Sequence, residues 1–271
     1  MEKVSVFCFG ASYFVAFVLC VVFLARPKPW VRFLEIAFAM GGILAHSIYL
    51  GYWQPPLVGQ FGWLLLSSWV LTVIYLYGVV HYRQFSWGLF ILPLVISLVV
   101  LGVFFPHPDQ PKGSSAGGWF ASTRILGLFH VGLLLSATVS ICLGSLASAM
   151  YLFQARQVRV KLQPGKGLAL FNLEKLESWI RGSIGVAFPL LTLGMVGGML
   201  LIAGQAQQLQ GWLDPRVIST GVLWLAFLAL VFARYGFQVR GKQLAWVTLT
   251  TFFLLLICLV LPHSFPQEGG R

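Results

Sequence analysis

Long apolar runs alternate with short polar connectors along the whole chain. Eight runs are long enough and carry few enough charges to cross a hydrocarbon layer of roughly 30 Å as α-helices. They lie at Val4–Ala25, Phe33–Trp53, Phe61–Val80, Trp87–Phe105, Trp119–Phe153, Trp179–Ala203, Val217–Tyr235 and Leu244–Pro262. The pattern predicts an all-α fold, a polytopic membrane bundle of eight transmembrane helices that forms a single domain over residues 1–271.

Composition and charge support this interpretation. The chain is 58% hydrophobic and 9% charged, whereas about 25% of residues are charged in a typical soluble domain. The net charge is +11, and 13 of the 18 Lys and Arg residues fall in connectors on one side of the expected membrane. Cytoplasmic connectors are the basic ones, so both termini are expected outside the cytoplasm. The basic residues therefore indicate a lipid bilayer and no nucleic-acid partner.

Two connectors and one pair of glycines predict local structure. Residues 154–178 form a basic cytoplasmic connector, in which we expect a short interfacial helix at Leu173–Glu177. A polar break at Gly204–Arg216 ends with Asp214 and Pro215, residue types that favour the N-cap and the first position of a following helix. Gly194 and Gly198 have the G-x-x-x-G spacing, which permits the close approach of a second helix.

Three of the five histidines are candidates for chemistry, because ionisable groups at membrane depth are costly. At a rise of 1.5 Å per residue, His46 is expected roughly 10 Å below the outer interface and His130 about 12 Å below it. His263 lies at the external end of the last run, on the side where the polar break emerges. Neutral imidazole is a common haem ligand. The structural alternative for His46 and His130 is a hydrogen bond to a neighbouring helix, and His263 could instead be an interfacial residue at a helix end.

Other side chains on the same side suit a haem. Arg216 and Arg124 could pair with propionates, and Trp212 and Trp119 could border the ring. We find no catalytic set, since the chain lacks a phosphate-binding glycine loop, a nucleophile elbow and paired carboxylates at membrane depth. The four cysteines are single, without C-x-x-C or C-x-x-C-H spacing, so covalent haem attachment is not expected.

Several stretches resemble one family of membrane proteins. The chain is similar to the cytochrome c assembly proteins of the CcmC/CcsA superfamily, and most closely to its eight-span HemX-like and YpjD-like branch. The stretches that carry the resemblance are Leu128–Ser136, Leu173–Leu176, Phe188–Gly194, Trp212–Arg216, Arg240–Lys242 and Leu261–Phe265.

The resemblance implies handling of haem, specifically haem b, at the outer face of a bacterial cytoplasmic (inner) membrane, with other cytochrome c assembly proteins as partners. By position, His130 and His263 match the family's axial ligands, and His46 matches a buried histidine seen in some members. Trp212, Asp214 and Arg216 take the place of the tryptophan-rich haem motif, although Leu213 stands where the motif has a tryptophan.

We therefore expect a haem-binding assembly factor that is not an enzyme and that holds haem between His130 and His263. His46 with His130 is a variant pair. The alternative is a non-haem membrane regulator or scaffold that acts on haem biosynthesis through the basic connector Arg156–Arg181. A small-molecule transporter is disfavoured, because the apolar runs contain few polar residues.

Overall fold

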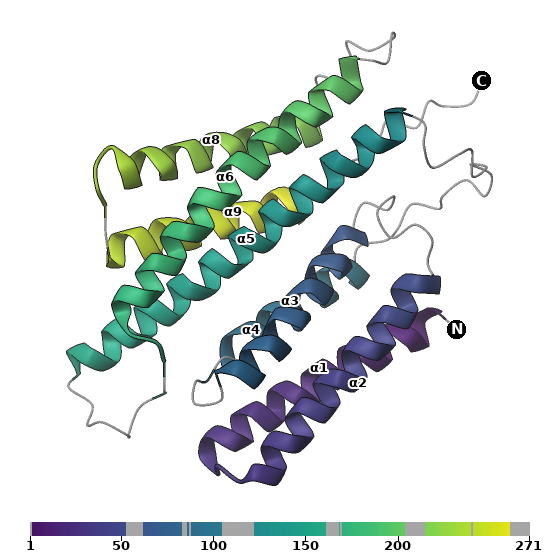
Figure 1. Cartoon of the computed structure of the whole chain (residues 1–271), viewed down its shortest axis with the longest axis vertical. Helices are drawn as coiled ribbons and strands as arrows, with labels where there is room; N and C mark the ends of the chain where they lie inside the picture. Colours follow the sequence, from purple (N-terminus) through teal and green to yellow (C-terminus); the bar gives the residue numbers. More distant parts are fainter. Residues whose placement is uncertain are drawn as a thin grey trace.

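The computed structural model describes residues 2–52, 62–82, 86, 88–104, 122–160, 168, 170–203, 215–239 and 241–260. Within these residues the regular structure is α-helical, and each helix runs back along the one before it (Figure 1). The eight helices are α1 (Glu2–Ala25), α2 (Pro29–Tyr52), α3 (Gly62–His81), α4 (Gly88–Phe104), α5 (Ser122–Arg159), α6 (Leu173–Ala203), α8 (Pro215–Tyr235) and α9 (Lys242–Val260).

Six of these helices, α1, α2, α3, α5, α6 and α8, are long and apolar enough to cross a membrane. The chain is therefore a multi-pass membrane protein. The other two, α4 and α9, have shorter apolar stretches, Gly88–Val103 and Lys242–Leu256, which at 1.5 Å per residue span about 24 and 22 Å. That six helices qualify confirms the expected helical membrane bundle, while the full count of eight spans stays a prediction.

The helix boundaries correct two expectations. α5 has 38 residues, a length of about 57 Å, because it continues from the expected end at Phe153 to Arg159. The short helix expected at Leu173–Glu177 is instead the start of α6. The Asn172 side chain accepts a hydrogen bond from the Lys175 backbone N–H at 3.0 Å, which caps α6. As predicted, Pro215 is the first residue of α8.

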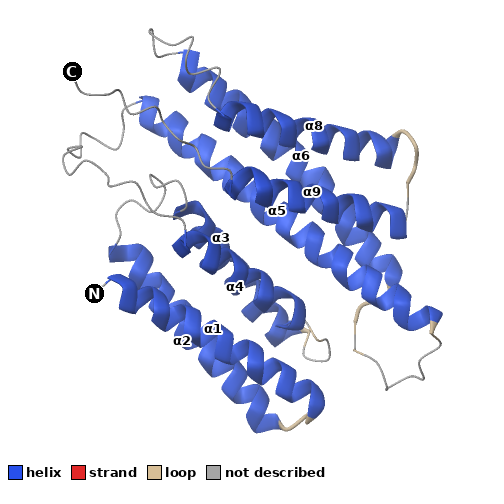
Figure 2. Cartoon of the chain, turned by 180° about the vertical axis from the view of Figure 1, so that it is seen from behind, coloured by secondary structure: helices blue, strands red, loops and turns tan. Residues whose placement is uncertain are grey.

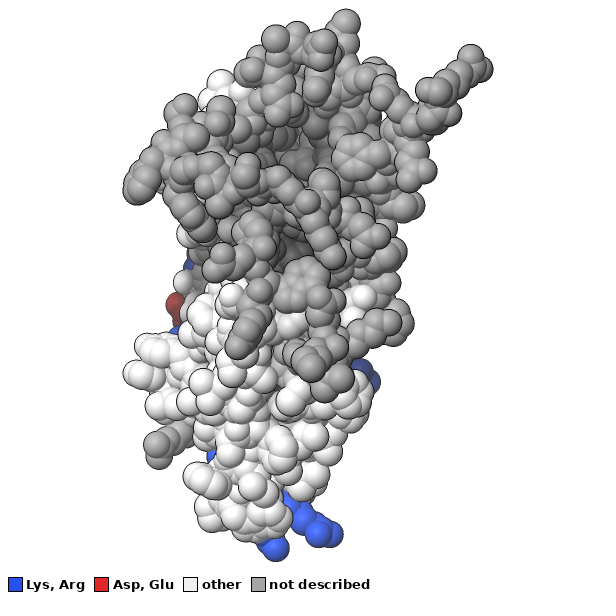
Figure 3. Space-filling view, turned by 90° about the vertical axis from the view of Figure 1, so that its right-hand side faces the viewer, with Lys and Arg blue, Asp and Glu red and all other residues white. Residues whose placement is uncertain are grey.

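The helices form two groups. One group consists of α1 to α4; the other consists of α5, α6, α8 and α9, in which α5 and α6 share the most extensive contact. The groups meet where α3 and α4 pack against α5 (Figures 1 and 2). They also meet at the Lys175 ammonium, which lies 5.2 Å from the Tyr82 ring centre and 4.6 Å from that of Phe171. Lys and Arg side chains mark the lower tip of the molecule (Figure 3).

A buried carboxylate, paired with an arginine, connects two helices of the first group. Glu35 of α2 is completely buried, and its carboxylate accepts hydrogen bonds from Arg32 at 2.8 Å and from the Tyr75 hydroxyl of α3 at 2.6 Å. A buried carboxylate is tolerated only when it is paired and hydrogen-bonded. Glu35 therefore ties α2 to α3 close to the α1–α2 connector.

Glu35→Gln should lower the free energy of unfolding by about 1–3 kcal/mol, because it removes the charge that Arg32 neutralises and leaves a poorer acceptor for Tyr75. Unfolding of the detergent-purified protein, followed by circular dichroism, measures this loss. Glu174→Gln is the matched control, since Glu174 is exposed and should change stability by less than about 0.5 kcal/mol. Equal losses in the two variants would contradict a stabilising role of the Glu35 contacts.

Candidate functional site

His130 lies on the face of α5 that packs against α6. Its Nδ1 atom is 2.6 Å from the backbone oxygen of Gly194. A carbonyl oxygen only accepts hydrogen bonds, so Nδ1 carries the proton and the lone pair of the neutral ring is on Nε2. A ring N–H donated to a backbone carbonyl fixes the tautomer and the orientation of metal-ligating histidines. No described residue hydrogen-bonds Nε2.

Small residues of α6 make room for the His130 ring. A Cβ atom on Gly198 would lie 2.7 Å from His130 Cε1, and one on Gly194 would lie 2.7 Å from Leu134 Cδ2. These distances are far inside van der Waals contact. The predicted close approach at the G-x-x-x-G spacing is therefore confirmed, and the structure identifies α5 as the helix that approaches. We call Gly194, Gly197 and Gly198 the glycine seat of His130.

His46 is enclosed between α1 and α2. Its ring is completely buried and stacks on Phe9 with ring centres 4.2 Å apart and an interplanar angle of 5°. The Tyr13 hydroxyl is 3.1 Å from His46 Nδ1. His46 Nε2 is buried and has no hydrogen-bond partner among the described residues. A ligand can reach this nitrogen only if α1 and α2 separate, so this geometry matches the hydrogen-bonding alternative.

The two described histidine candidates contact different helices. His46 packs against α1 in the first group, whereas His130 packs against α6 in the second. No described contact joins the two imidazoles. The structure thus places the part-buried His130 ring against small residues of α6 and encloses His46, and no described contact brings the two rings together.

The remaining candidates lie outside the described residues in whole or in part. His263, Trp212, Asp214 and Trp119 lie outside them entirely. Arg216 and Arg124 are in the first turns of α8 and α5, and the description there is limited to the helical backbone. α5 and α8 begin at the end of the bundle where α9 finishes (Figure 1). The first turns that contain Arg124 and Arg216 are therefore at the same end of the bundle.

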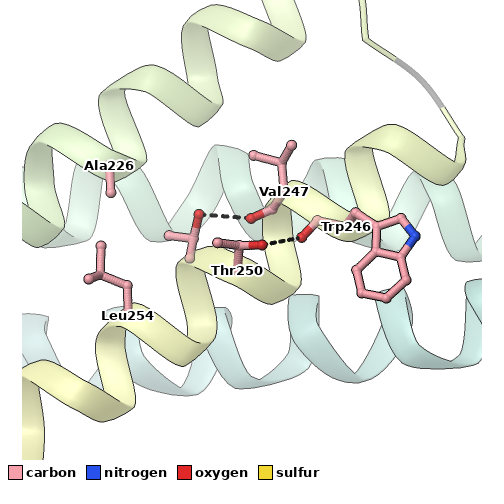
Figure 4. A pocket seen from close by; sticks show the side chains of 6 residues that line it. Ala226, Trp246, Val247, Thr250 and Leu254 are labelled. Carbon is pink, nitrogen blue, oxygen red and sulfur yellow. Dashed lines mark hydrogen bonds between the residues drawn. The ribbon is translucent and has the colours of Figure 1, made fainter.

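The structure also contains a cavity that lies apart from both histidines. It has a volume of about 230 Å³ and lies between α8 and α9 (Figure 4). Two threonines in its wall, Thr250 and Thr251, donate their hydroxyls to carbonyls of their own helix at 3.0 and 2.9 Å. The lining is therefore effectively apolar, and it contains no histidine. The full lining is Ala226, Trp246, Val247, Thr250, Thr251 and Leu254.

Metal ligation by protein side chains alone finds no support among the described residues, which contain no group of three His, Cys, Asp or Glu side chains placed to hold an ion. Haem iron requires less from the protein, because the porphyrin supplies four nitrogens and one or two axial ligands complete the site. A single imidazole with an open Nε2, such as that of His130, fits this requirement.

Comparison with known proteins identifies one family. A family model described as cytochrome C assembly protein matches residues 57–266. "Cytochrome c biogenesis protein CcsA" of Trieres chinensis is 23% identical over 238 residues, which cover 78% of this chain and 75% of that protein. "Protein HemX" of Brevibacillus brevis is 26% identical over 217 residues, covering 79% and 76%. No solved structure matches the chain. The family match includes His130 and His263 but begins after His46.

Tyr13→Phe should destabilise the protein by about 1–3 kcal/mol, because it leaves both nitrogens of the buried His46 ring without a partner. Thermal unfolding in detergent measures the effect. Tyr77→Phe is the control, since Tyr77 is also a helical tyrosine but is 57% exposed, and it should stay within about 0.5 kcal/mol of the wild type. If Tyr13→Phe were as stable as Tyr77→Phe, the Tyr13 hydroxyl would not be satisfying His46.

Proposed function

The chain belongs to the cytochrome c assembly protein family, and on that basis we propose that it is an integral membrane haem-handling protein that assists cytochrome c assembly. It acts in the bacterial cytoplasmic membrane with eight spans and both termini outside. It holds and passes on haem with partner assembly proteins and is not itself a catalyst. The observation that carries the proposal is the His130 ring, with Nδ1 bound to Gly194 and Nε2 open.

His130 Nε2 is the primary axial ligand in this proposal. Haem b supplies the iron and the four porphyrin nitrogens. The protein contributes a fixed imidazole orientation, because the glycine seat and the Gly194 carbonyl restrict the ring on two sides. A carbonyl partner also raises the basicity of the ligating nitrogen, which strengthens its bond to iron.

His263 is the proposed second ligand, and the register of α5 against α9 supports it. A Cβ atom on Gly144 of α5 would lie 3.6 Å from Thr248 Cγ2, and one on Gly241 would lie 2.8 Å from the Tyr151 hydroxyl. The two helices are therefore antiparallel. Moving one residue toward the start of α5 corresponds to moving one residue toward the end of α9. Continued along α9, this register brings Val260, the last described residue of that helix, to the level of Gly132 on α5, two residues after His130.

Trp212, Asp214 and Arg216 are proposed to complete the site. In this proposal Asp214 is the N-cap of α8, which begins at Pro215, and the cap would fix where Arg216 leaves the helix. The guanidinium then pairs with a haem propionate, and Trp212 borders the ring. The variant pair of His46 with His130 would require α1 and α2 to separate first, since His46 Nε2 is enclosed.

A specific observation also favours the alternative, a non-haem regulator or scaffold. Beyond the expected membrane end of α5, the helix carries the exposed bases Arg156 and Arg159 together with Val158 and Val160, whose side chains are 59% and 63% exposed. A mixed basic and apolar surface of this kind suits a soluble partner protein. Purification of the protein without a chromophore but with a bound soluble partner would favour the alternative.

His130→Ala should reduce the Soret absorbance of the haem-loaded, detergent-purified protein at least about 10-fold, since it removes the primary axial ligand. His81→Ala is the matched control, because His81 is exposed, is the last residue of α3 and stacks on Tyr77. Its spectrum should equal that of the wild type. Unchanged absorbance in His130→Ala would remove the ligand assignment, and His263→Ala tests the second ligand in the same way.

Gly198→Ala should weaken haem binding about 10-fold or shift the Soret maximum, because the new methyl group would meet the His130 ring at 2.7 Å and displace Nε2. Gly182→Ala adds the same methyl group to the same helix, where nothing lies within 4 Å, and should leave the spectrum unchanged. Identical spectra for both variants would show that the glycine seat does not position the ligand.

A further inference from the structure

An arginine in the interior of the second helix group has no ion-pair partner among the described residues. Arg234, in the last turn of α8, is only 7% exposed and continues the buried face formed by Phe227 and Leu230. Its Nη1 atom donates a hydrogen bond to the Val239 carbonyl at 3.0 Å. Its Nε atom is buried without a partner among the described residues. The guanidinium therefore has a donor that no described residue uses.

No acidic side chain among the described residues is paired with Arg234. The ion pair among these residues joins Arg32 to Glu35, and Glu174 and Glu177 lie at the start of α6 without bonding Arg234. The side chains of the remaining acidic residues, Glu2, Asp109, Asp214 and Glu268, lie outside the described part of the chain. The carbonyls at the end of α8 offset part of the positive charge, but a buried cation calls for an anion.

An apolar cavity lies between α8, the helix of this arginine, and α9. Trp246 is at the end of the cavity near the α8–α9 connector, and Ala226 faces Leu254 at the other end (Figure 4). Ala226 is eight residues before Arg234 on α8, which corresponds to about 12 Å along the helix. A hydrocarbon chain of lipid length covers this distance. The cavity wall offers no free hydroxyl, because Thr250 and Thr251 bond to their own helix.

We propose that α8 and α9 bind one anionic phospholipid from the leaflet on the basic side of the membrane. Its phosphate oxygens accept hydrogen bonds from the Arg234 guanidinium, and one acyl chain lies in the cavity between Ala226 and Trp246. Arginine suits phosphate through its planar set of donors, and basic pockets between membrane helices on the cytoplasmic side bind anionic head groups.

The charge of the head group selects among lipids. A choline head group brings its own cation next to Arg234 and to Lys242, the first residue of α9, whereas a glycerol head group leaves the phosphate charge uncompensated. The site prefers phosphatidylglycerol over phosphatidylcholine for this reason. It shares no residue with the His130 site and stands independently of haem binding.

The test uses the full-length protein, delipidated in detergent and titrated with phosphatidylglycerol or phosphatidylcholine under native mass spectrometry. The wild type should bind one phosphatidylglycerol at least 10-fold more tightly than phosphatidylcholine. Arg234→Gln should abolish this preference. Arg159→Gln is the matched control, because Arg159 is an exposed base at the same end of the bundle, and it should keep the preference. Retained preference in Arg234→Gln overturns the proposal.

A second variant keeps the test decisive if Arg234→Gln does not fold. Ala226→Phe fills the cavity without touching the head-group residues, and it should weaken the binding of phosphatidylglycerol at least 10-fold. Unchanged binding in this variant overturns the assignment of the acyl chain. Inorganic phosphate is the soluble probe: if it raises the unfolding temperature of the wild type as much as phosphatidylglycerol does, the site binds a free anion and the lipid assignment is wrong.

Discussion

Inside a membrane-spanning bundle, every polar group must find its partner within the protein, because the surrounding hydrocarbon offers none. Most described polar side chains meet this condition locally. Ser148 and Thr248 donate their hydroxyls to carbonyls four residues earlier in their own helices, and Glu35 collects donors from two helices. The exceptions are therefore informative. His46 Nε2, Gln154 Oε1 and Arg234 Nε are buried without partners among the described residues, and His130 bonds to a described residue through Nδ1 alone.

The contact between α5 and α6 shows how this condition produces a site. Helix carbonyls normally bond to the N–H four residues later, and side chains of the same helix hide them from neighbours. At Gly194 and Gly198 no side chain intervenes, so the His130 ring of α5 reaches the Gly194 oxygen at 2.6 Å. The same missing side chains that allow two backbones to approach also set which nitrogen of the histidine carries the proton. Packing and ligand chemistry are thus determined by the same residues.

The sequence was informative about elements and much less so about contacts. Hydropathy located the apolar helices, and Asp-Pro chemistry located the start of α8. The expected end of α5 and the expected start of α6 are wrong, because basic residues predict a connector there, although Arg and Gln are good helix formers and Asn172 is an N-cap type. His130 and the G-x-x-x-G spacing were both noted, but their pairing depends on the register between two helices, which periodicity alone does not contain. The enclosure of His46 by Phe9 and Tyr13 depends on tertiary packing in the same way.

The difference between the two helix groups follows from these contacts. The first group buries Glu35, His46, Ser68 and Thr72 completely, so its polar groups serve its own cohesion and are closed to ligands. Among the described residues, the second group contains a histidine that bonds through Nδ1 alone at a seat of small residues, an arginine without an ion-pair partner, and the apolar cavity. The family match begins between α2 and α3, so the enclosed α1–α2 pair lies outside it and the second group lies within it. Ligand handling is therefore expected of the second group, which α1 to α4 support from one side.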